Sequence, residues 1–103
     1  MIRHLVTLKF AENTSDAERQ SIMEQLAALQ PRIEGFLDFQ VRRNVSPETP
    51  VVRGFLDMFW VDFADEAARD AYLVDSEHKK AGARLVSALE GGVDGLFVYD
   101  FEV

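Results

Sequence analysis

The sequence contains no cysteine and few basic residues, only three prolines and no long apolar run. Without cysteine there is no disulfide, no thiol nucleophile and no thiolate metal site. Eleven Lys and Arg against eighteen Asp and Glu give a formal net charge of −7. Nucleic acids and anionic lipid surfaces both attract clustered cations, so we expect this acidic chain to bind neither nucleic acid nor membrane.

Apolar stretches are short throughout the chain. Runs such as residues 59–61 and 96–99 fall far below the roughly 20 residues that span a bilayer. Polar side chains interrupt the first ten positions, which excludes a secretory signal there, and we expect a cytoplasmic protein. The 103 residues, 48% hydrophobic and 28% charged, fit a single globular domain over residues 1–103.

Four segments show the alternation of apolar and polar side chains that is typical of β-strands. They are residues 2–10, 36–44, 54–63 and 96–103. In the second of them the alternation places Leu37, Phe39 and Val41 on one side. Residues 45–53 contain two prolines and predict an irregular, mobile loop.

Two helical regions separate these strands. The first is predicted to start at the capping box formed by Ser15 and Glu18 and to end near residue 30, because Pro31 disfavours a helical conformation before it. The second starts at Asp65, is interrupted at 75–76 and ends at the glycine pair 91–92.

The resulting order, β-α-β-β-α-β, is that of the ferredoxin-like fold: an α+β structure with an antiparallel sheet and helices on one face. The strand at 54–63 is apolar on both sides, with Phe55 and Phe59 on one and Leu56, Met58 and Trp60 on the other. Helices cover only one of these faces. We therefore expect a homodimer in which a second copy covers the other face.

Five short motifs occur in order along the chain: residues 2–10, residues 43–48, the pair 53–54, Tyr72 followed six positions later by His78, and residues 98–102. Together they resemble the stress-responsive A/B-barrel domain (Dabb) family. The resemblance implies a dimeric α/β barrel. It also implies, from plant members similar to polyketide cyclases, that Tyr72 and His78 would drive a cofactor-free aldol cyclisation, with His4 lining the same cavity.

The chain departs from these relatives at two places. Their His-Pro-x-His element reads Asp75-Ser76-Glu77-His78, and Asp57 stands where the cyclase-like members have a histidine on the third strand. Asp57 shares a face with apolar residues, and burial there would raise its pKa. It would act as a second base or pair with Arg42, Arg43 or a cation of the partner chain, and we favour the pairing.

His78 is the candidate general base. With Ser76 as the N-cap, it lies in the first helical turn, where the helix dipole disfavours imidazolium and lowers the pKa. Asp75 and Glu77 act in the opposite direction, so the sign of the net shift stays open. A neutral imidazole near pH 7 accepts protons. The alternative is a half-buried histidine with a purely structural role.

Tyr72 is the candidate partner of His78, since its hydroxyl would donate a hydrogen bond to a carbonyl or enolate oxygen. The alternative is a core aromatic residue whose hydroxyl reaches solvent. His4 alternates with Val6 and Leu8 and points toward the helices, which predicts that these three residues line the cavity. A histidine in such a position is more often a hydrogen-bonded core residue. No spacing of His and carboxylates indicates a transition-metal site.

Three functions are compatible with these residues. The first is a small homodimeric barrel that binds a small hydrophobic or aromatic molecule and cyclises it by general-base chemistry without a cofactor. The second is a non-catalytic stress-responsive protein. The third, based on fold analogy alone, is a cofactor-free monooxygenase.

Overall fold

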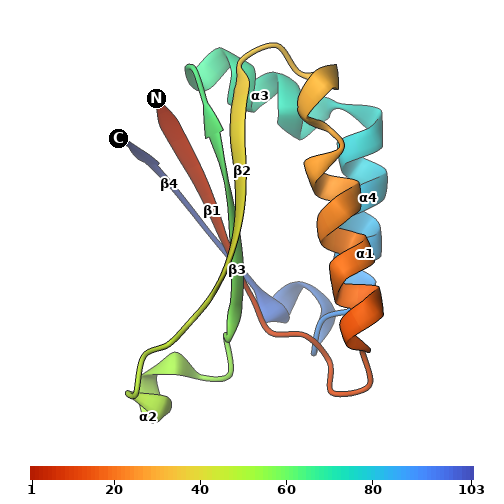
Figure 1. The fold of residues 1–103 in the computed structure, drawn as a ribbon, viewed down its shortest axis with the longest axis vertical. Coiled ribbons are helices and arrows are strands. Elements are labelled where there is room, and N and C mark those ends of the chain that lie inside the picture. The colour runs from red at the N-terminus through yellow and green to blue at the C-terminus, as the bar shows by residue number, and fades with distance from the viewer.

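The computed structural model describes all 103 residues, with a four-stranded antiparallel sheet at its centre (Figure 1). The strands are β1 (Ile2–Leu8), β2 (Phe36–Arg43), β3 (Asp57–Phe63) and β4 (Leu96–Glu102), in the spatial order β2-β3-β1-β4. β1 is paired on both sides, because His4 lies opposite Val61 of β3 and opposite Asp100 of β4. The ferredoxin-like α+β fold expected from the sequence is thereby confirmed.

Three helices cover one face of the sheet: α1 (Asp16–Ala27), α3 (Glu66–Val74) and α4 (Ser76–Ser87) (Figure 1). The Ser15 side chain accepts the backbone N–H of Glu18, as the capping box predicts. α1 ends earlier than expected, because the residues around Pro31 form a separate 3₁₀ turn, η1 (Gln30–Arg32). A second 3₁₀ turn, η2 (Gly92–Gly95), precedes β4. No helix combines the length and apolarity that crossing a membrane requires.

The expectation of an irregular loop at 45–53 is wrong in part. A one-turn helix, α2 (Thr49–Val52), lies at the end of the arm between β2 and β3 (Figure 1). The arm is anchored where the Asn44 side chain donates to the Phe55 carbonyl and accepts the Ser46 N–H. Arg53 and Gly54 have positive φ values of 57° and 80°, which end α2 and delay the start of β3 to Asp57.

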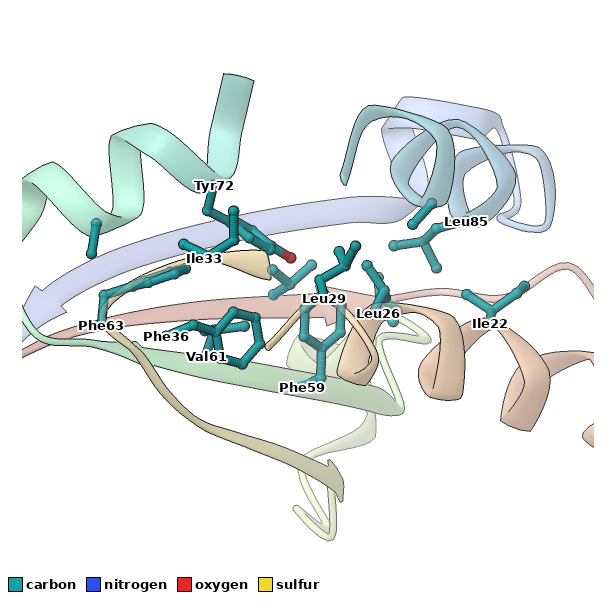
Figure 2. Close-up of a cluster of buried hydrophobic side chains, with 14 of the residues drawn as sticks. Ile22, Leu26, Leu29, Ile33, Phe36, Phe59, Val61, Phe63, Tyr72 and Leu85 are labelled. Carbon is teal, nitrogen blue, oxygen red and sulfur yellow. The ribbon is translucent and has the colours of Figure 1, made fainter. Parts of the chain in front are cut away.

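The hydrophobic core lies between the sheet and the helices (Figure 2). Its largest fully buried side chains are Tyr72, Phe63, Leu8, Ile22, Leu26 and Val61. On β2 the expected alternation is broken by a register shift between Phe36 and Asp38. The extra residue, Leu37, is exposed, and Phe36 is buried in its place. The prediction that Leu37 shares a face with Phe39 is therefore wrong.

The outer face of the sheet has no helix over it (Figure 1). On β3, Met58 and Trp60 are half-buried and face outward, as expected from a strand that is apolar on both sides. The exposed large aromatic side chains, however, all belong to the edge strand β4. Its outward side chains are between 42% and 54% exposed: Phe97, Tyr99 and Phe101.

Gly35 offers a direct test of how α3 is seated over β2. It has a φ of +88°, and a Cβ at this position would lie 2.7 Å from the Ala68 Cβ of α3. We expect Gly35→Ala to lower the free energy of unfolding by about 1–3 kcal/mol, because it adds backbone strain and a steric clash. Urea denaturation measures the change.

Gly91→Ala is the matched control. Gly91 has a comparable φ of +69°, but its nearest contact would be 3.4 Å away, at the Asp94 Cβ. Its substitution should therefore cost strain without the clash. Equal losses in the two variants would contradict the close approach at Gly35.

Candidate functional site

A cavity of about 220 Å³ lies between the sheet and α3 and α4. Most of its lining is apolar and comes from β1, β3, β4, α1, α3 and α4. Three polar side chains line it as well: His4, Tyr72 and His78. The ring centres of Tyr72 and His78 are 4.0 Å apart, and those of Tyr72 and His4 are 5.9 Å apart. The structure thus brings together the three polar residues that the family resemblance places in one cavity, and Val6 lines the same cavity.

A helix break between Tyr72 and His78 allows their rings to meet. Six residues on an unbroken helix would face well apart around the axis. Here α3 ends at Val74, and Asp75 adopts an extended conformation before α4 begins. α4 runs in a different direction from α3 (Figure 1). His78, the third residue of α4, therefore lies against the Tyr72 ring.

Asp75, not Ser76, is the N-cap of α4. One Asp75 carboxylate oxygen accepts the backbone N–H groups of Glu77 and His78 at 2.9 and 3.0 Å. The other accepts from the Arg32 guanidinium at 3.0 Å. The predicted cap is wrong because the Asp carboxylate satisfies two free helical N–H groups at once. The Arg32 hydrogen bond, followed by those from the backbone, lowers the pKa of Asp75 and keeps it ionised.

The environment of His78 favours its neutral form. Burial lowers the pKa of His78, and the neighbouring His4 lowers it further. The Leu73 carbonyl and Asp75 act in the opposite direction but do not reverse the shift. The Nδ1 atom of His78 is buried and has no partner in good hydrogen-bond geometry within the chain. Burial is thus the largest influence on the pKa of His78, and it acts downward.

Tyr72 is the largest fully buried side chain of the protein, at 1% exposure. In Figure 2 its ring reaches from α3 into the core cluster, with the hydroxyl oxygen directed away from Phe63. Burial raises the pKa of Tyr72 far above its usual value, so the hydroxyl keeps its proton. No protein group forms a hydrogen bond with this hydroxyl, which leaves it free to donate to a molecule in the cavity.

His4 is held by a chain of two polar contacts that the sequence analysis missed. Its Nδ1 lies 2.7 Å from Asp100 Oδ1, and Asp100 Oδ2 accepts from Arg69 Nη1 at 3.0 Å. The contact with the Asp100 carboxylate orients the imidazole ring of His4 in the cavity. The sequence held one indication of this contact. Asp100 follows Leu96 and Val98 in the row of β4 side chains that faces inward, where an acidic residue needs a polar partner.

Leu8 and Asp57 lie elsewhere. Both line a second cavity, of about 530 Å³, on the other side of α1 against β2 and β3. Asp57 lies 3.7 Å from Arg19 and 4.0 Å from Arg43. The preferred interpretation, pairing with an arginine, agrees with this geometry, although Arg19 was not anticipated. Arg42 instead lies over the Trp60 ring. No three His, Asp or Glu side chains converge as a metal ion would require.

Comparison with known proteins places this geometry in a family. The sequence profile described as "Stress responsive A/B Barrel Domain" matches residues 2–103. Among curated proteins, no significant match was found.

Three solved structures resemble the chain closely. A dimeric ferredoxin-like protein of unknown function from Jannaschia is 32% identical, with a TM-score of 0.87 and coverage of 99% of this chain and 98% of that one. A Dabb family protein from Mesorhizobium loti is 22% identical, with a TM-score of 0.76 and coverage of 99% and 95%. A hydroxynitrile lyase from Passiflora edulis is 14% identical, with a TM-score of 0.83 and coverage of 99% and 92%.

The influence of His4 on His78 can be measured by NMR titration of the imidazole signals. We expect the pKa of His78 to lie below the usual value of about 6.5 and to rise in His4→Gln, because a neighbouring positive charge is removed. Between the lowered pKa of the folded state and the usual pKa of about 6.5, the unfolded chain binds more protons at His78 than the folded chain does. The free energy of unfolding should therefore fall as the pH is lowered through that window.

Arg42→Gln serves as the control, because it removes a cation from the outer face of the sheet. It should leave the pKa of His78 unchanged. An unaltered His78 titration in His4→Gln would contradict the coupling of the two rings.

Proposed function

Because the chain belongs to the stress-responsive A/B barrel domain family, we propose that it is a small-molecule enzyme that moves a proton next to a carbonyl group inside the 220 Å³ cavity. One observation carries this proposal. A neutral imidazole and a protonated, unpartnered phenol, those of His78 and Tyr72, lie side by side in an apolar enclosure. A base and a hydrogen-bond donor in this arrangement are what enolate formation needs.

The proposed reaction begins with proton abstraction. His78 takes a proton from the carbon next to a carbonyl group, and the Tyr72 hydroxyl donates a hydrogen bond to the oxygen that gains negative charge. In a cyclisation the enolate carbon then attacks a second carbonyl of the same molecule. The new carbon–carbon bond leaves an alkoxide, and the His78 imidazolium returns the proton to it. The atoms balance without an oxidant or reductant.

The second polar cluster supports this chemistry by position. His4 is fixed through Asp100 to Arg69 of α3, three residues before Tyr72. His4 therefore lines the cavity in a fixed orientation, beside the Tyr72 ring. The hydroxynitrile lyase among the structural relatives supports catalysis on this fold.

We also propose that two copies pair through the outer faces of their sheets. Phe97, Tyr99 and Phe101 form an exposed apolar patch there, and solved relatives are dimeric. The Trp60 Nε1 group faces the same side and is buried without an acceptor in the chain. A second copy would cover this patch as a C2 dimer, the commonest symmetric assembly.

Proton exchange tests the catalytic proposal. Acetophenone and related methyl ketones in D₂O should lose their methyl proton signals faster with the protein than without it. His78→Gln should slow this exchange by about 10²–10⁴-fold, because the general base is lost. Tyr72→Phe should slow it by about 10²–10³-fold, because only the oxygen-stabilising hydroxyl is lost. One-dimensional NMR measures the rates.

Tyr99→Phe is the matched control, since it removes the hydroxyl of the only other tyrosine, which lies on the outer face. Its exchange rate should equal that of the wild type. Full activity in His78→Gln would refute the role of this base. Ligand-induced shifts without any exchange would indicate a binding protein instead.

Sedimentation velocity tests the assembly. The wild type should sediment as a dimer at micromolar concentration. Phe101→Asp should dissociate or unfold it, because burying an unpaired charge costs several kcal/mol. Val74→Asp, at an exposed site at the end of α3, should leave the dimer intact. A folded wild-type monomer would disprove the pairing.

A further inference from the structure

One stripe of α4 faces the cavity that holds His78. His78, Gly82 and Val86 all line it, at positions i, i+4 and i+8 of the helix. The middle of this stripe therefore has no side chain. Immediately beside the proposed base, the wall of the cavity is bare helical backbone.

Neither the backbone nor the packing requires glycine at this position. Gly82 has no positive φ, and a Cβ built on it would meet no atom within 4 Å. This contrasts with Gly35, where both φ and a close contact demand glycine. Glycine inside a helix is less stable than alanine, so a glycine without a packing reason has a destabilising effect that the fold itself does not explain.

The surroundings of Gly82 indicate where the cavity meets solvent. β4 is the edge strand of the sheet, and its Val98, which lines the cavity, is 46% exposed. Leu73 lines the cavity from α3 and is 40% exposed. By contrast, Leu26, Phe59 and Leu85 on the other walls are buried. The open side is therefore bounded by α4, the end of α3 and β4.

We propose that ligands reach His78 and Tyr72 through the open space beside Gly82, where no side chain blocks the cavity. This passage admits carbonyl compounds with a single ring. The inference rests on the proposed function of this cavity. A cavity of 220 Å³ exceeds the roughly 150 Å³ known to hold benzene and is smaller than the roughly 300 Å³ at which pockets for drug-sized ligands begin. One ring with a short carbonyl substituent fits these limits.

Binding of acetophenone and of the two-ring ketone 2-acetylnaphthalene, followed by NMR shifts of the His78 imidazole, tests the passage. The wild type should bind acetophenone at least tenfold more tightly than 2-acetylnaphthalene. Gly82→Leu should weaken acetophenone binding at least tenfold, because its side chain fills the mouth. Ala83→Leu adds the same side chain at the exposed neighbouring position and should bind like the wild type.

Gly82→Ala gives a second, independent measurement. Because a methyl group fits without a clash and alanine favours the helix, the Tm should rise by roughly 4–8 °C, as expected for a domain of this size. A lower Tm would show that packing requires the glycine and would overturn the inference. Unchanged acetophenone binding in Gly82→Leu would overturn it as well.

The two proposals fail in different ways. Wild-type protein that binds neither ketone would overturn both the passage and the proposed site. Acetophenone binding that Gly82→Leu abolishes, without proton exchange in the wild type, would leave the passage standing and refute only the catalysis.

Discussion

The register of β1 is the constraint on which the rest of the molecule depends. β1 is paired on both edges, and its inward row delivers His4 and Val6 to the cavity and Leu8 to the core. A slip of one residue would turn that row to the outer face and separate His4 from Asp100. The register is protected by the outward row as well, where Arg3 forms a two-pronged ion pair with the buried Asp62 of β3. Polar contacts on both faces thus fix one alignment.

Asp75 plays the corresponding role among the helices. Its carboxylate caps α4 and binds Arg32 of η1, and Asp75 is also the residue at which α3 ends, so three segments meet at this residue. The angle between α3 and α4 sets the approach of Tyr72 to His78. A single exposed ion pair contributes little to stability. The Arg32–Asp75 pair matters here because it fixes the interruption between α3 and α4. Tyr72 lies on one side of this interruption and His78 on the other.

Local patterns in the sequence were sufficient for the strands and the Ser15 cap, whereas the expectation that His4, Tyr72 and His78 share one cavity came from the family resemblance. They failed where the deciding partner lies far along the chain. Leu37 turns outward because of a bulge that depends on pairing with β3, and alternation within β2 alone cannot reveal it. Asp57 falls in a different cavity because α1 lies between the two spaces, which no strand pattern records. Arg69 reaches Asp100 across 31 residues, a contact that only the assembled fold defines.

The pairing of the first and last strands also sets a timetable for biosynthesis. His4 and Asp100 are 96 residues apart, and the central strand β1 gains its second neighbour only when β4 has been made. At about 5–20 residues per second, translation leaves the edge of β1 that pairs with β4 bare, and His4 without its carboxylate, for about 5–20 s. During this interval the nascent chain exposes an apolar strand edge of the kind that chaperones shield. Contacts of such long range also predict slow folding for a protein of this length.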